Sequence, residues 1–97
     1  MRLVIAAPAN GTILKNALKA HLQNDPRVSS LVDLSSPEGT YPQLSFAAAE
    51  EVVAGRADRA LLICGTGVGT AIAANKVRGI RAATAHDLLT LRGSVEN

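Results

Sequence analysis

The chain has 97 residues, enough for a single domain over residues 1–97 with a core of modest size. Its hydrophobic fraction of 47% is ordinary for a folded protein, and no apolar run is long enough to cross a bilayer, which argues against a membrane partner. An aromatic content of 2% and a net charge of +2, with the ten Lys and Arg scattered along the chain, argue against a nucleic-acid partner.

The first third of the sequence predicts a strand, a helix and a second strand. A continuous apolar run at residues 3–7 is typical of a strand buried on both faces of a parallel sheet. After a break at residues 8–12, where Asn10 or Thr12 is available as an N-cap, helical spacing predicts a helix that ends before Pro26. The residues expected on its buried face are Ile13, Leu14, Ala17, Leu18, His21 and Leu22, with Lys15 and Lys19 facing outward.

The remaining elements continue the alternation. Residues 28–34 predict a weaker strand, and a helix begins near Tyr41-Pro42 and ends at Gly55. The following stretches predict a strand at 59–64, a helix at about 70–76, a strand at 80–85 and a short helix at 88–95. Alternating strands and helices imply an α/β fold with a parallel sheet covered on both faces. Ligands bind such sheets beyond the carboxyl ends of the strands, which here are residues 8–11, 35–41, 64–69 and 86–87.

Cys64 lies at one of these strand ends, directly before a loop in which Gly65, Gly67 and Gly69 alternate. In such a loop the backbone amides point toward a bound ligand. A helix N-terminus also lowers the pKa of a thiol that faces it. The alternatives are a turn without a ligand and a cysteine that only packs. The dinucleotide fingerprint does not fit, because its third glycine position holds Thr70.

A single cysteine forms no internal disulfide, which favours a reducing, cytoplasmic setting.

His86 and Asp87 follow the predicted fourth strand. His86 is either an acid and base at the rim of the sheet or a packing residue, and Asp87 either orients it or caps the last helix. One cysteine and two distant histidines give no metal-ligand spacing, so we expect no metal.

The stretch LICGTGVGTAIAANKVRGIRAATAHD resembles the signature region of the RpiB/LacA/LacB family of sugar-phosphate isomerases, which includes ribose-5-phosphate isomerase B. LKNALKAHL in the first helix and YPQL at the start of the second fit the same alignment, over essentially all 97 residues. The resemblance implies an aldose–ketose isomerase that acts on a phosphorylated pentose or tetrose, with neither metal nor organic cofactor. It also implies a homodimer.

The resemblance assigns roles to individual positions. Cys64 falls on the family's general base, which moves a proton between the two carbons of an enediolate. His86 falls on the histidine that opens the furanose ring, and Thr66 falls on a hydroxyl that contacts the substrate. The positions expected to bind substrate are Pro8, Ala9, Asn10, Tyr41, Gly65, Gly67, Val68, Gly69 and Asp87.

The sequence departs from the family pattern in two places. Pro8 and Ala9 occupy the positions of a polar pair that helps to bind sugar hydroxyls and phosphate, and Thr40 replaces a frequent acidic residue. The chain also ends at Asn97, without the family's fifth strand and C-terminal helix. We therefore expect a three-layer α/β/α Rossmann-like domain with strand order 2-1-3-4. Two alternatives to the isomerase stay open: the same scaffold acting on a different or unphosphorylated substrate, and a non-catalytic remnant that binds a partner or ligand.

Overall fold

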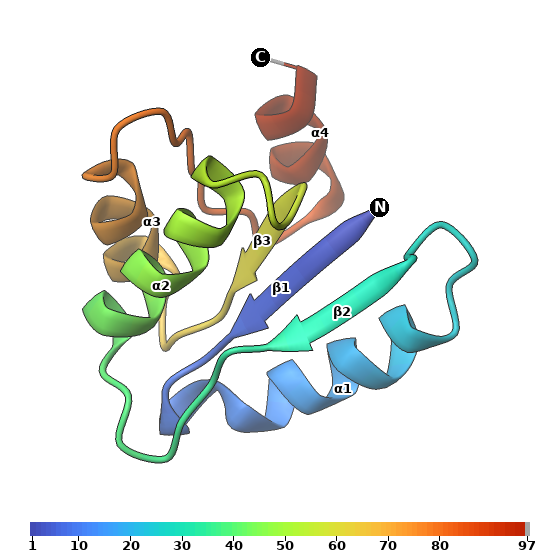
Figure 1. Ribbon diagram of the computed structural model, residues 1–97, viewed down its shortest axis with the longest axis horizontal. Helices are drawn as coiled ribbons and strands as arrows, with labels where there is room; N and C mark the ends of the chain where they lie inside the picture. Colours follow the sequence, from blue (N-terminus) through green and yellow to red (C-terminus); the bar gives the residue numbers. More distant parts are fainter. Residues whose placement is uncertain (97) are drawn as a thin grey trace.

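Three parallel strands form the sheet at the centre of the computed structural model, which describes residues 1–96 (Figure 1). The strands are β1 (Arg2–Ala6), β2 (Ser30–Asp33) and β3 (Arg59–Leu62), in the order β2-β1-β3. The helices are the 3-10 helix η1 (Ala9–Gly11), α1 (Thr12–Gln23), α2 (Tyr41–Val53), α3 (Val68–Asn75) and α4 (Leu88–Glu96). The α/β class, the parallel pairing and the order 2-1-3 confirm the sequence prediction for these elements.

The central strand separates two apolar layers. Val4 packs with Ala48 and Ala57 on the face that α2 covers, and its neighbour Ile5 packs with Ile63 on the other face, beside Leu18 of α1. Successive residues of a strand point to opposite faces, so an uninterrupted apolar run is what a doubly covered strand requires. Helix α3 packs against α2. The three layers are therefore α1, the sheet, and α2 with α3.

Helix α1 turns only part of its predicted apolar face to the sheet, because Leu18 packs there as predicted but Ile13 and Leu14 do not. Ile13 is 90% exposed and Leu14 is also exposed, whereas Lys15 is only 8% exposed. Both Lys15 and Lys19 place their Nζ atoms 3.0 Å from Oδ2 of Asp33 in β2. These two ion pairs bring the lysine side of α1 onto β2, which turns Ile13 and Leu14 outward. The predicted caps were also wrong: the helix begins after Gly11, without a side-chain cap.

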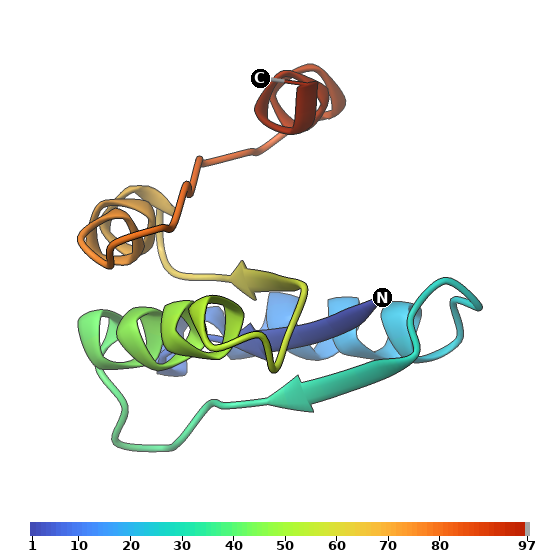
Figure 2. The ribbon, with the colours of Figure 1, turned by 45° about the horizontal axis from the view of Figure 1, so that its top comes forward.

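The predicted fourth strand at residues 80–85 is not formed, so the order 2-1-3-4 was wrong in its last member. The Asn75 side chain explains the difference at the middle of this segment. Its amide nitrogen donates to the Ala82 carbonyl at 2.8 Å, and its oxygen accepts from the Ala82 amide at 2.7 Å. Both backbone groups of Ala82 are thereby satisfied without a strand partner. Figure 2 shows this segment leading away from the sheet toward α4.

Helix α4 forms where the sequence predicts it but buries none of its residues. Leu88, Leu91 and Val95, which share one side of the helix by their spacing, are all exposed. Asp87 caps the helix by accepting from the Thr90 amide at 2.7 Å. Figure 2 shows α4 standing apart from the other layers.

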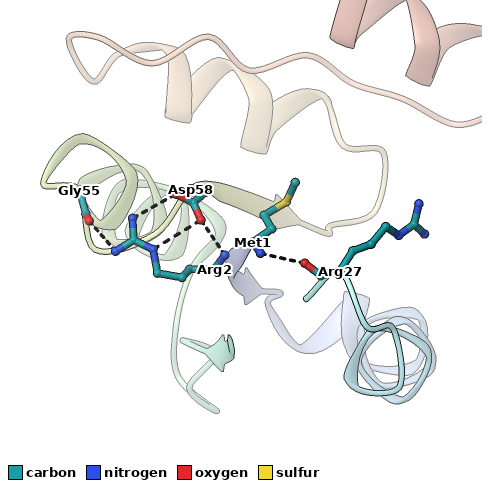
Figure 3. A network of polar contacts seen from close by, with 5 residues as sticks. All are labelled: Met1, Arg2, Arg27, Gly55 and Asp58. Atoms are coloured by element: carbon teal, nitrogen blue, oxygen red, sulfur yellow. Dashed lines mark hydrogen bonds and ion pairs between the residues drawn. The ribbon is translucent and has the colours of Figure 1, made fainter. Parts of the chain in front are cut away.

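The amino ends of the strands are joined by a polar network, shown in Figure 3. Arg2 donates to the Gly55 carbonyl at 2.9 Å and pairs with the Asp58 carboxylate at 3.0 Å, while the terminal amine of Met1 donates to the Arg27 carbonyl at 2.8 Å. This network joins β1 to the segment that enters β3, at the end of the sheet opposite to Cys64. No helix within residues 1–96 is long and apolar enough to span a membrane.

Candidate active site

A pocket of about 600 Å³ opens where β1, β2 and β3 end. Its volume lies within the range usual for small-molecule sites. Three connections line it: the turn after β1, the loop after β2 that leads into α2, and the loop between β3 and α3. The lining residues are Pro8, Ala9, Asn10, Pro37, Glu38, Gly39, Tyr41, Cys64, Gly65, Thr66 and Gly69. The structure thus brings together residues from three of the four strand ends that the sequence singles out.

The Cys64 thiol is partly buried at this site and surrounded by hydrogen-bond donors. The Gly67 amide donates to its Sγ atom at 3.1 Å, and Oγ1 of Thr70 lies 3.6 Å from the same sulfur. Burial raises the pKa of the thiol, but the Thr70 hydroxyl and the amides of Thr66, Gly67 and Thr70 outweigh it, so the pKa is lower than its ordinary value. More of the thiol is therefore ionised at neutral pH than in a free cysteine, which favours a role as base or nucleophile.

Two glycines of the loop are required by its geometry. Gly67 has φ of +81°, a left-handed conformation, and serves as N-cap of α3. Gly69 lies against Tyr41, where an added Cβ would come within 2.7 Å of the ring atom Cε1. The left-handed conformation of Gly67 lets the chain turn back under the sulfur. The absence of a side chain at Gly69 allows the Tyr41 ring to form the adjacent wall of the pocket.

Some backbone amides of the loop between β3 and α3 already donate hydrogen bonds within the loop. The Gly67 amide is engaged with Cys64, and the Val68 amide donates to Oγ1 of Thr66 at 3.2 Å. Gly67 and Val68 do not line the pocket, whereas Gly65, Thr66 and Gly69 do. Because the Thr66 oxygen accepts this bond, its hydroxyl hydrogen remains available to a ligand.

His86 and Asp87, both predicted for the site, lie outside the residues that line the pocket. The His86 side chain is 74% exposed, and its Nδ1 lies 3.5 Å from Oδ2 of Asp87. The segment before them still contacts the loop, because Thr84 Oγ1 donates to the Gly67 carbonyl at 3.1 Å. Since residues 80–85 form no strand, they do not carry His86 to the carboxyl edge of the sheet.

Sequence reasoning missed Pro37, Glu38 and Gly39 as lining residues. The sequence predicts that residues 35–41 follow a strand at the ligand edge of the sheet, but no chemical motif distinguishes individual positions there. Glu38 is the only charged side chain in the lining, and neither lysine, arginine nor histidine is among the described lining residues. Residues 1–96 contain no cluster of three or more His, Cys, Asp or Glu that could hold a metal ion.

A thiol in a strand-end pocket, beside a glycine loop that opens a helix, defines a site for chemistry on a small polar molecule. The sequence model of the Ribose/Galactose Isomerase family matches residues 3–97, and the chain belongs to this family.

Named relatives agree with this assignment. The chain is 50% identical over 99 residues to D-erythrulose-4-phosphate isomerase 2 of Mycolicibacterium smegmatis, covering 98% of this chain and 65% of that one. It is 45% identical over 73 residues to ribose-5-phosphate isomerase B of Escherichia coli, covering 74% of this chain and 49% of that protein. The ribose-5-phosphate isomerase B structure from Clostridium thermocellum superposes with a TM-score of 0.91 at 35% identity, covering 99% of this chain and 66% of that one. The matched part of the chain thus spans between 49% and 66% of the length of these relatives.

Proposed function

We propose that this chain carries the proton-transfer site of a sugar-phosphate isomerase that interconverts an aldose and a ketose. The observation that carries the proposal is the Cys64 thiol, held in the strand-end pocket with the Gly67 amide 3.1 Å from its sulfur and a lowered pKa. The names of the relatives support the same reaction class, with phosphorylated tetroses and pentoses as their substrates.

The proposed reaction moves one proton from C2 to C1 and one from the C2 oxygen to the C1 oxygen, and it needs no external oxidant or reductant. In the open-chain aldose, the Cys64 thiolate removes the proton from C2, which lies next to the carbonyl carbon C1. The electrons flow onto the carbonyl oxygen and give an enediolate. The thiol then returns a proton to C1, and the C2 hydroxyl proton passes to the C1 oxygen as C2 becomes the carbonyl carbon, which gives the ketose and restores the thiolate. In this proposal the Gly65 and Gly69 amides and the Thr66 hydroxyl, which belong to residues that line the pocket, stabilise the developing oxyanion.

Turnover of two substrates by the protein and by Cys64→Ala tests the proposal. We expect the protein to convert ribose 5-phosphate or erythrulose 4-phosphate, and the loss of the thiol to lower kcat by about 10²–10⁴-fold, the usual contribution of a general base. The Cys64→Ser variant is the matched control, since its hydroxyl keeps the size of the side chain but is a far weaker base. Equal rates for the protein and Cys64→Ala would remove the thiol from the mechanism.

A second candidate function is favoured by one observation: within residues 1–96, no cationic side chain lines the pocket. The same proton transfer then acts on an unphosphorylated polyhydroxy carbonyl compound. Inorganic phosphate separates the two candidates, because a site that binds the phosphate of its substrate is inhibited competitively by the free anion. Strong competition supports the phosphorylated substrate, and indifference supports the unphosphorylated one.

Three further features belong to this proposal. His86 opens the furanose ring of a cyclic substrate, for which it has to approach the pocket from its exposed position. The protein forms a homodimer, an assembly that would cover the exposed apolar side chains of α4. It acts as one domain in a reducing, cytoplasmic setting, where its single cysteine stays a thiol. Sedimentation of the protein at several concentrations measures the dimer directly.

A further inference from the structure

We propose that Glu38 is the hydroxyl-binding and selectivity residue of the pocket. Its carboxylate would hold the uncharged, hydroxyl-bearing part of the substrate and keep an anionic group away from the loop after β2. The inference rests on the proposed function in taking a polyhydroxy carbonyl compound as the ligand of this pocket.

The first support comes from the kinds of side chain that line the pocket. Among the lining residues within 1–96, Glu38 is the only Asp, Glu, Lys, Arg or His, and the other polar side chains are Asn10, Tyr41, Cys64 and Thr66. An ionised carboxylate has two oxygens that only accept hydrogen bonds, so it pairs with two neighbouring hydroxyl groups of a sugar. Hydrogen bonds with one ionised partner are about twice as strong as neutral ones. The same negative charge repels a phosphate at that place.

The second support is that the carboxylate is available. Within residues 1–96 the Glu38 side chain makes no hydrogen bond and no ion pair, and the residue is exposed at the rim. Some other carboxylates of the chain are engaged, among them Asp33 with Lys15 and Lys19, and Asp58 with Arg2. Glu38 can therefore accept hydrogen bonds from a ligand without breaking a bond inside the protein.

The third support is the backbone that carries Glu38, which is fixed on both sides. The Gly39 amide donates to the Ser36 carbonyl at 3.1 Å and closes a turn around Glu38. Thr40 then caps α2 in a reciprocal pair with Gln43. Gly39 packs closely on Leu44, where an added Cβ would come within 2.9 Å of the side chain. Such a support fixes the point at which the Glu38 side chain leaves the backbone, which favours binding of a ligand.

These observations divide the pocket into two parts. Cys64 and the loop at residues 65–69 form the side that suits the carbonyl and its developing negative charge. Glu38 forms the side that suits hydroxyl groups. The family resemblance implies a polar pair after β1, but this chain has Pro8 and Ala9 there. In our proposal Glu38 supplies the missing carboxylate from the neighbouring loop after β2.

The test is Glu38→Gln, compared with Glu50→Gln, which removes the same charge from an exposed position of α2 outside the pocket lining. Alkylation of Cys64, the only cysteine, is followed by mass spectrometry while D-ribose, ribose 5-phosphate or inorganic phosphate is titrated. We expect Glu38→Gln to raise the D-ribose concentration needed for half protection about tenfold, as for the loss of one charge-assisted hydrogen bond, and to strengthen protection by phosphate. Glu50→Gln should change neither. In turnover, Glu38→Gln should raise KM and leave kcat within about twofold.

Separate outcomes decide the two proposals. If the protein turns over ribose 5-phosphate but Glu38→Gln behaves like Glu50→Gln in protection and KM, the role of Glu38 is overturned while the isomerase stands. If no substrate is turned over but D-ribose protection depends on Glu38, the binding role stands and the isomerase fails. Absence of protection by D-ribose in the unaltered protein also overturns the role of Glu38.

Discussion

Replacement of Gly69 by alanine tests how closely the pocket wall is packed. The added Cβ would lie 2.7, 3.0 and 3.2 Å from Cε1, Cζ and Cδ1 of Tyr41, whereas ordinary contact begins at 3.4 Å. The nearest ring atom must therefore move by about 0.7 Å, the difference between 3.4 and 2.7 Å. Overpacking of this kind costs about 1–3 kcal/mol, and alanine regains roughly 0.5–1 kcal/mol in a helix, so we expect a net loss near 1 kcal/mol.

The displaced ring also changes the pocket, because both residues line it. A misplacement approaching 1 Å lowers kcat/KM substantially, and we expect a loss of about tenfold. Urea unfolding and steady-state kinetics measure the two effects. Gly93→Ala is the control, since a Cβ there meets nothing within 4 Å. Adding Tyr41→Leu should restore the stability of Gly69→Ala. Unchanged stability and kcat/KM in Gly69→Ala, or no recovery in the double variant, would refute the predicted contact.

Three further predictions concern other parts of the molecule. Asp33→Asn leaves Lys15 and Lys19 without their carboxylate, which should cost about 2 kcal/mol in urea unfolding at pH 7, more than Asp58→Asn at the exposed network of Figure 3. Because the ion pairs and the Ser35 contacts outweigh burial and hold the pKa of Asp33 below its ordinary value, this contribution exists above about pH 4 and is lost as the pH falls; an equal cost at pH 7 and pH 2 would contradict it. His86→Ala should slow turnover of ribose 5-phosphate, which forms a furanose ring, and spare erythrulose 4-phosphate, whose C4 oxygen carries the phosphate and closes no ring; equal losses would deny His86 a role in ring opening. The alkylation rate of Cys64 should reach half its maximum at a lower pH in the folded protein than in urea, since hydrogen bonds to the sulfur lower its pKa; coincident titrations would show that the loop does not act on the thiol.

The elements that sequence patterns predicted best are those with one dominant cause. The run at residues 3–7 is apolar throughout because β1 is covered on both faces, and Pro42 marks the start of α2, which Thr40 caps in the structure. The buried face of α1 was predicted only in part: Leu18 packs on the core as predicted, whereas Ile13 and Leu14 are exposed because two lysines pair with Asp33 on a strand that is distant in sequence. Periodicity alone counts a lysine as an outward residue.

The site shows the same division. Cys64 and its glycine loop are adjacent in sequence, so a short motif was sufficient to mark them. Glu38 could not be selected, because its place in the lining depends on a turn after β2 that meets the loop after β3 only in the folded chain. The fourth strand was predicted from the propensity of residues 80–85, which takes no account of Asn75: its side chain binds both backbone groups of Ala82, seven residues further along the chain.

Exchange of the substrate's carbon-bound proton tests the central claim, that the Cys64 thiolate moves this proton. The protein is incubated with ribose 5-phosphate in D₂O, and deuterium at C1 and C2 is followed by NMR, with Cys64→Ala under the same conditions. We predict that the protein incorporates deuterium from the solvent during turnover and that Cys64→Ala exchanges at least about 10²-fold more slowly. Exchange by Cys64→Ala at the rate of the unaltered protein would contradict the account.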